Sequence, residues 1–138
     1  HSKRINNVAI LQPTSPLRNV THIKQAAKIK DEKSAKAIVS VCELEHPIEF
    51  CNYLKDNHSM NGFIDKKKLQ RTQDLRSCYR LNGAIYYFER NYVGNLGQLY
   101  REGTYAYIMK PRSSIDIDVE DDFELAKFYK LSERGLCE

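Results

Sequence analysis

Short runs of apolar residues, separated by polar or amphipathic stretches, recur along the chain and predict the strands of one sheet. The first run, 8–11, is continuous and is cut off by Pro13, so it predicts a core strand that is buried on both faces. A second run at 37–42 is rich in β-branched residues and predicts the next core strand. Two later strands are expected at 84–88 and 104–109.

Two other stretches have helical spacing. The first is expected to begin at Asn19 or Thr21, either of which can cap it, and to end near residue 30. The second is expected at about 119–131, with Asp118 as its cap and acidic residues in its first turn. A strand, a helix and a strand in succession predict a parallel crossover, and therefore an α/β fold.

The stretch 43–80 has no clean period and is long for a connection inside one sheet. We therefore expect it to have a small structure of its own, inserted in a single domain that covers 1–138. Its basic part, 66–80, contains Arg71, whose planar guanidinium suits a carboxylate. A solvated basic surface explains the same residues without a ligand.

Composition narrows the class of protein. The 138 residues fit one domain, and no apolar run approaches the ~20 residues of a membrane span. The net charge of +4 is too mild to indicate a nucleic-acid partner. Lys3 and Arg4 precede only a short apolar run, so no signal peptide is expected. The four cysteines form no C-x-x-C pair, which favours reduced thiols and a cytoplasmic location.

Asp116 and Asp118 alternate along the chain, so their carboxylates face one side of an extended segment. Two convergent carboxylates suit Mg²⁺, which prefers oxygen ligands. A helix cap explains Asp118 without a metal. Gln12 ends the first strand, where open α/β sheets place ligand contacts, whereas Thr14 and Ser15 are expected to serve the turn.

Three segments carry a resemblance to a known family. The stretch 11–18, which reads LQPTSPLR, and the segments 69–87 and 113–126 resemble the acylneuraminate cytidylyltransferases, which make CMP-sialic acid and its relatives. The resemblance covers the C-terminal portion of the family's domain. It implies a three-layer, Rossmann-like nucleotidyltransferase fold of the nucleotide-diphospho-sugar transferase type, with a mainly parallel sheet that lacks its N-terminal strands. It also implies that 43–80 projects and builds a homodimer contact.

The same resemblance assigns roles to residues. In the reaction it implies, the anomeric hydroxyl of a nonulosonic (sialic-type) acid attacks the α-phosphate of CTP and pyrophosphate leaves. Asp116 and Asp118 hold Mg²⁺, and Arg71 holds the carboxylate of the sugar acid. The other residues expected to bind the sugar are Gln12, Gln73, Asn82 and Tyr86.

One part of the family's pattern is absent. No glycine-rich basic loop of the kind that cradles the CTP phosphates occurs in the chain. We therefore expect the isolated chain to be inactive, and to associate through 43–80 or an exposed sheet edge. A proline that often follows the family's Arg-x-Gln-Asp is replaced here by Leu75, Arg76 and Ser77.

Three alternatives stay open at this point. The sugar acid could be Kdo, legionaminic acid or pseudaminic acid. The chain could instead be a non-catalytic binding or dimerisation module. An RNA-binding domain built on the basic stretch 66–80 is the third alternative, and its binding would fall steeply with salt.

Overall fold

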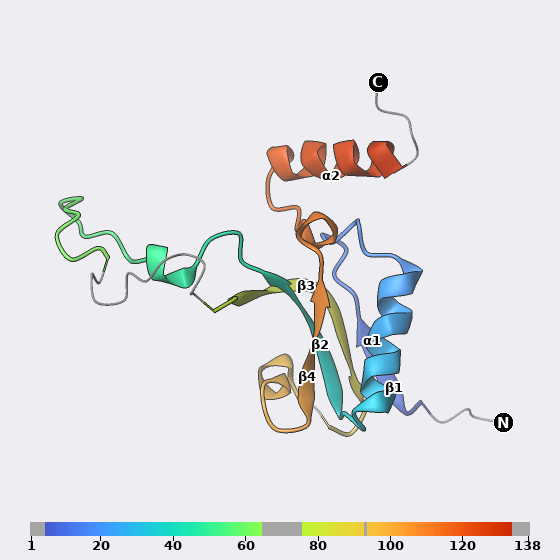
Figure 1. Ribbon diagram of the computed structural model, residues 1–138. Helices are drawn as coiled ribbons and strands as arrows, with labels where there is room; N and C mark the ends of the chain where they lie inside the picture. Colours follow the sequence, from blue (N-terminus) through green and yellow to red (C-terminus); the bar gives the residue numbers. More distant parts are fainter. Residues whose placement is uncertain (1–4, 65–75, 93, 134–138) are drawn as a thin grey trace. The chain divides into compact units, whose positions relative to one another are not determined.

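The computed structural model describes residues 5–64, 76–92 and 94–133. The chain divides into two compact units, one formed by 1–42 with 81–138 and the other by 43–80. The first unit contains a four-stranded sheet in the order β1-β3-β2-β4 (Figure 1). Its strands are β1 (Asn7–Ile10), β2 (Ala37–Glu43), β3 (Tyr79–Glu89) and β4 (Thr104–Met109).

Three of these strands run in one direction and β3 runs in the other. β1 pairs antiparallel with β3, whereas β2 pairs parallel with β4. β3 is also antiparallel to β2, because Glu89 N–H donates to the Lys36 carbonyl while Ile85 N–H donates to Ser40 Oγ. The carboxyl ends of β1, β2 and β4 therefore lie together at one end of the sheet, with the amino end of β3. We call this end the carboxyl edge. The predicted α/β class is confirmed, but the reversal of β3 was not predicted.

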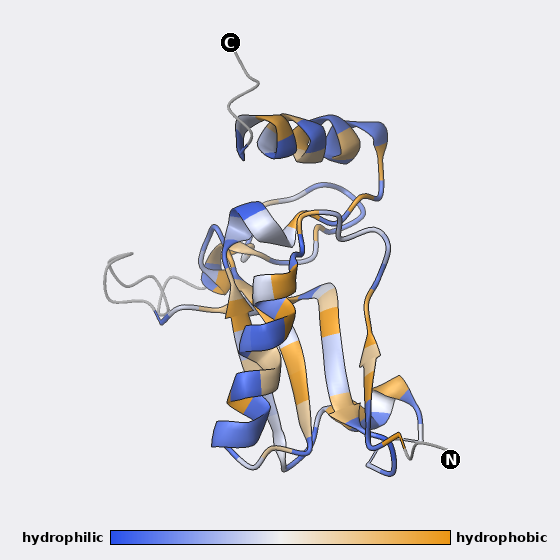
Figure 2. Ribbon diagram, turned by 90° about the vertical axis from the view of Figure 1, so that its right-hand side faces the viewer, coloured by the Kyte–Doolittle hydropathy of each residue, from blue (hydrophilic) through white to orange (hydrophobic). Residues whose placement is uncertain are grey.

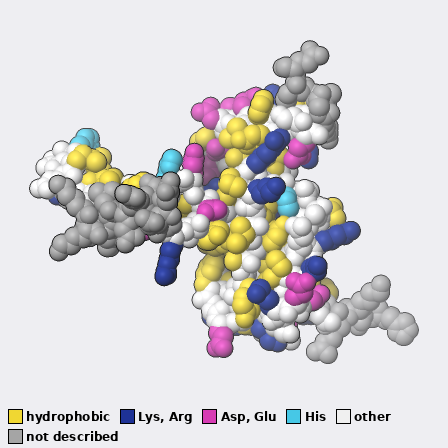
Figure 3. Space-filling view, viewed as in Figure 1, with side chains coloured by type: hydrophobic (Ala, Val, Ile, Leu, Met, Phe, Trp, Pro, Cys, Tyr) yellow, Lys and Arg dark blue, Asp and Glu magenta, His cyan; other side chains and the backbone are white. Residues whose placement is uncertain are grey.

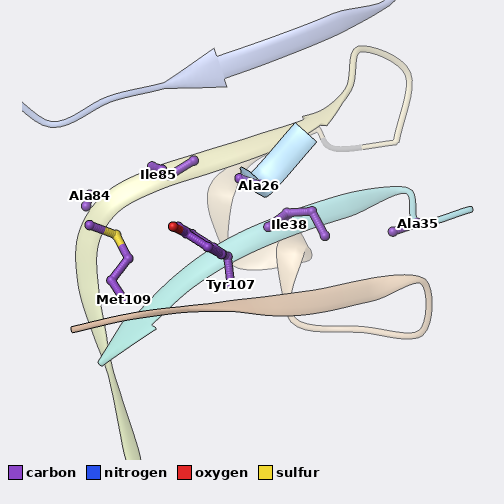
Figure 4. Close-up of a cluster of buried hydrophobic side chains, with 7 residues drawn as sticks. All are labelled: Ala26, Ala35, Ile38, Ala84, Ile85, Tyr107 and Met109. Carbon is purple, nitrogen blue, oxygen red and sulfur yellow. The ribbon is translucent and has the colours of Figure 1, made fainter. Parts of the chain in front are cut away.

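Helix α1 (Val20–Glu32) covers one face of the sheet (Figures 1 and 2). A buried cluster lies between them, with side chains from α1 and three strands (Figure 4). Its members are Ala26, Ala35, Ile38, Ala84, Ile85, Tyr107 and Met109. On the other face a second cluster forms around Leu99, which belongs to the 3₁₀ turn Leu96–Leu99. Hydrophobic side chains remain exposed over the sheet (Figure 3).

The two helices begin in different ways. Asn19, one of the two predicted caps, caps α1: its side chain accepts from His22 N–H at 3.1 Å, and His22 Nδ1 accepts from Asn19 N–H at 3.2 Å. Helix α2 (Glu120–Glu133) begins one residue later than predicted, so Asp118 is not its cap. Instead the carboxylate of Asp122 accepts from the amides of Asp118 and Val119, each at 3.1 Å. Acidic side chains gather at the start of α2 (Figure 3).

Strand β1 lies at an edge of the described sheet. Val8 and Ile10 are half-buried, while Ala9 and Leu11 are exposed. The prediction that this run is buried on both faces is wrong for the described residues, because β3 is its sole neighbour in the sheet.

The unit 43–80 contains the 3₁₀ turn Ile48–Phe50, followed by turns. Its contact with a second copy of the chain stays a prediction. Within the described ranges, none of the helices combines the length and the apolar character that crossing a membrane requires.

Ile38 and Ile108 test the placement of the α1-side core. Ile38 is fully buried on β2, whereas Ile108 on β4 is 56% exposed. We expect Ile38→Ala to lower the free energy of unfolding by about 2–5 kcal/mol, because it leaves a cavity. The matched variant Ile108→Ala should change it by no more than about 0.5 kcal/mol. Urea denaturation measures both, and equal losses would contradict this description of the core.

Candidate functional site

Three residues from distant parts of the sequence meet at the carboxyl edge of the sheet. Gln12 follows β1, Gly83 lies in β3, and Asp116 follows β4. A Cβ atom placed on Gly83 would overlap Gln12 Oε1, and would lie 3.0 Å from Gln12 Cδ and 3.7 Å from Asp116 Oδ2. The amide of Gln12 therefore rests on the bare backbone of Gly83, with the carboxylate of Asp116 beside it. This is the edge at which open α/β sheets bind ligands.

Gly83 has a backbone that favours glycine. Its φ is +69°, in the left-handed region that residues with a Cβ adopt only at a cost. The glycine is thus required twice, by its own conformation and by the side chain of Gln12. The group that approaches the backbone of Gly83 most closely is the side-chain amide of Gln12.

Hydrogen bonds connect the loop after β1 to the elements on two sides of it. Arg18 Nη1 donates to the carbonyls of Gln12 and Ala84, each at 2.9 Å. Ile117 N–H donates to the Thr14 carbonyl at 2.9 Å. Burial lowers the pKa of Arg18, but a guanidinium stays charged in proteins. The loop that presents Gln12 is therefore bonded both to β3 and to the segment that carries Asp116.

The carboxylate of Asp116 is half-buried, and its Oδ1 has no hydrogen-bond partner among the described residues. A buried carboxylate oxygen without a partner is costly, and a cation would offset that cost. Asp118 lies two residues on and is exposed. The described part of the chain contains no group of three or more His, Cys, Asp or Glu residues suited to a metal. Asp116 and Asp118 are two carboxylates, and Mg²⁺ in proteins commonly takes one or two carboxylates and keeps several waters.

Tyr86 lies near this carboxylate and is 9% exposed. Burial raises the pKa of Tyr86 above its ordinary value, and nearby Tyr100 and Asp116 raise it further. Its phenol is therefore neutral at physiological pH and can donate a hydrogen bond. Tyr100, in the loop between β3 and β4, was not among the residues predicted from the sequence.

Asn82, another predicted sugar ligand, is 1% exposed. Its side chain is hydrogen-bonded to Ser40, Ala84 and Ser114. Arg71 and Gln73 lie outside the described residues. The structure thus brings Gln12, Asp116 and Tyr86 to one edge, with Asn82 in the interior beside Gly83.

Comparison with curated proteins finds relatives that cover most of the chain. The N-acylneuraminate cytidylyltransferase of Escherichia coli O18:K1:H7 is 35% identical over 120 residues, 86% of this chain and 28% of that protein. The pseudaminic acid cytidylyltransferase of Campylobacter jejuni serotype O:23/36 is 31% identical over 137 residues, 92% of this chain and 55% of that protein. The CMP-N,N'-diacetyllegionaminic acid synthase of Legionella pneumophila is 29% identical over 95% of this chain and 57% of that protein.

These relatives confirm the resemblance read from the sequence: curated homologues of the chain are named as acylneuraminate cytidylyltransferases. No model of a known protein family matches the chain. The chain spans between 28% and 57% of the length of the three relatives.

A second glycine, Gly62, allows the contact between Gly83 and Gln12 to be tested separately from the backbone strain at Gly83. Gly62 also has a positive φ, of +76°, but an added Cβ would meet nothing within 4 Å. We expect Gly83→Ala and Gly62→Ala each to lower the free energy of unfolding by about 1–2 kcal/mol through the backbone. Gly83→Ala alone should shift the side-chain amide resonances of Gln12 in a ¹⁵N–¹H spectrum. Unshifted Gln12 resonances in folded Gly83→Ala would contradict the contact.

Proposed function

We propose that this chain forms the sugar-acid and metal part of a cytidylyltransferase that joins CMP from CTP to a nonulosonic acid. The observation that carries the proposal is the buried, unpartnered carboxylate oxygen of Asp116 beside Gln12 and Gly83. It lies at the ligand-binding edge of an α/β sheet. The printed names of the homologues agree on cytidylyl transfer to acids of this class.

Asp116 and Asp118 are the residues that would hold Mg²⁺. The metal, when bound, neutralises charge on the triphosphate and helps pyrophosphate to leave. Asp116 contributes an oxygen that has no other hydrogen-bond partner among the described residues. Asp118 is exposed, and its carboxylate is not occupied as a helix cap because α2 begins at Glu120.

The residues that would hold the sugar acid are Gln12, Tyr86, Arg71 and Gln73. The amide of Gln12 can accept from or donate to a hydroxyl or acylamino group. Tyr86 can donate from a neutral phenol, because its raised pKa keeps the hydroxyl protonated at physiological pH. Arg71 and Gln73 lie outside the described residues and are included because the sequence resembles the family there; a guanidinium suits a carboxylate.

Three sugar acids are candidates for the acid that receives CMP. Relatives named for N-acylneuraminate, pseudaminic acid and legionaminic acid are 35%, 31% and 29% identical to the chain. The homodimer contact through 43–80, a cytoplasmic location and the need for a separate CTP-phosphate loop stay predictions.

Asp116→Asn tests the metal site. Because it replaces the carboxylate by a neutral amide of the same shape, we expect it to weaken Mg²⁺ binding at least about tenfold, or about 1.4 kcal/mol. Asp121→Asn is the matched control, since Asp121 is an exposed residue of the first turn of α2. Isothermal titration of the chain with Mg²⁺ measures both, and equal affinities in the two variants would refute the site.

Sugar-acid binding tests the function itself. In the presence of Mg²⁺, N-acetylneuraminic, pseudaminic and N,N'-diacetyllegionaminic acids are titrated while the amide resonances of Gln12 and Gly83 are followed. At least one acid should shift these resonances saturably, whereas glucuronic acid, an acid of a different sugar class, should not. Equal response to glucuronic acid, or no response to any of the three, would contradict the proposal.

A further inference from the structure

Asn82 is buried at the point where the site is assembled. Its Oδ1 accepts from Ser40 Oγ at 2.6 Å and from Ala84 N–H at 3.2 Å. Its Nδ2 donates to Ser114 Oγ at 2.9 Å. With two donors on its oxygen, Asn82 has no acceptor position left for a sugar, and with 1% of the residue exposed the remaining N–H of its amide is covered by the protein.

The bond from Asn82 to Ala84 closes a turn around Gly83. A side-chain oxygen that accepts from the N–H two residues on is the bond by which Asn stabilises tight turns. Here that bond spans the residue with a φ of +69°. On the far side of Gly83, the Ala84 carbonyl accepts from Arg18 at 2.9 Å. The conformation of Gly83 is thus held by the residues on both sides of it.

The other bonds of Asn82 connect this turn to two further elements. Ser40 belongs to β2, and its Oγ also accepts from Ile85 N–H at 2.7 Å. Ser114 follows β4, donates to the Lys110 carbonyl at 2.9 Å, and precedes Asp116 by two residues. Asn82 therefore joins the strand that carries Gly83 to the segment that carries Asp116.

We propose that Asn82 is a positioning residue and not a ligand: it holds Gly83 in the left-handed conformation on which the Gln12 amide rests beside Asp116. Ser40 and Ser114 contribute by holding the side chain of Asn82 through hydrogen bonds. The Mg²⁺ and sugar-acid affinities expected here rest on the proposed function. The placement of Gly83 and Gln12 by Asn82 does not depend on any ligand.

A double-mutant cycle between Asn82 and Ser40 tests the proposal. Ser40 is 1% exposed and cannot touch a ligand. If Asn82 acts by positioning, Asn82→Ala and Ser40→Ala should each weaken Mg²⁺ binding about tenfold. The double variant should then lose little more than either single variant, because both disrupt one network. Both single variants should also shift the side-chain amide resonances of Gln12.

A direct ligand would behave differently. If Ser40→Ala binds Mg²⁺ and the sugar acids within about twofold of the unmodified chain while Asn82→Ala does not, the positioning role is overturned. Ile38→Val is the stability control, because it weakens the core on the same strand without touching the network. If Ile38→Val reproduces the Gln12 shifts and the loss of affinity, the effect is one of stability, and the proposal is also overturned.

The two proposals fail in distinguishable ways. If the unmodified chain binds neither Mg²⁺ nor a sugar acid, the proposed function fails. The Gln12 resonances and the hydrogen exchange of the Ala84 amide then decide the role of Asn82. Faster exchange at Ala84 and shifted Gln12 resonances in both single variants support the role, and unchanged values overturn it.

Discussion

The close approach of the Gln12 side chain to the backbone of Gly83 is the constraint on which the candidate site depends. A residue with a Cβ at this position would displace the amide, and the left-handed φ of Gly83 would also be strained. The contact fixes the end of β1 against the interior of β3. It also sets the place beside which the carboxylate of Asp116 lies.

Hydrogen bonds over long sequence separations keep this contact in place. Arg18 joins the carbonyls of Gln12 and Ala84, and Asn82 joins β2, β3 and the segment after β4. Such buried polar networks specify a single arrangement when their members are satisfied. By contrast, Asp116 Oδ1 lacks a partner among the described residues, and the one group left unsatisfied at this edge is the one proposed to bind the metal.

Local patterns in the sequence predicted much of the fold. The helix start at Asn19 or Thr21, the strand at 104–109 and the final helix follow from spacing and from residue type alone, whereas the capping box with His22 was not predicted. The reversal of β3 could not be predicted in this way, because apolar residues on a buried strand look the same in either direction. The cap of α2 was assigned to Asp118 rather than Asp122, since both lie in one acidic run.

Local patterns in the sequence also predicted part of the candidate site. Gln12 directly follows the first strand, so the sequence could indicate its place at the edge. Asp116 was indicated by its alternation with Asp118 and by the resemblance to the family. The interior direction of the Asn82 side chain depends on Ser40 and Ser114, which are 42 and 32 residues away, and no local signal reveals such bonds. Tyr100 was missed because its approach to Tyr86 depends on how the β3–β4 loop folds back.

A crystal structure of the chain grown with Mn²⁺ in place of Mg²⁺ tests the site most directly, because anomalous scattering locates the metal. The site described here predicts a peak within bonding distance of Asp116 Oδ1, close to Gln12 and Gly83, with waters among its other ligands. A metal bound away from this edge, or an Asp116 Oδ1 that is hydrogen-bonded to the protein, would contradict it.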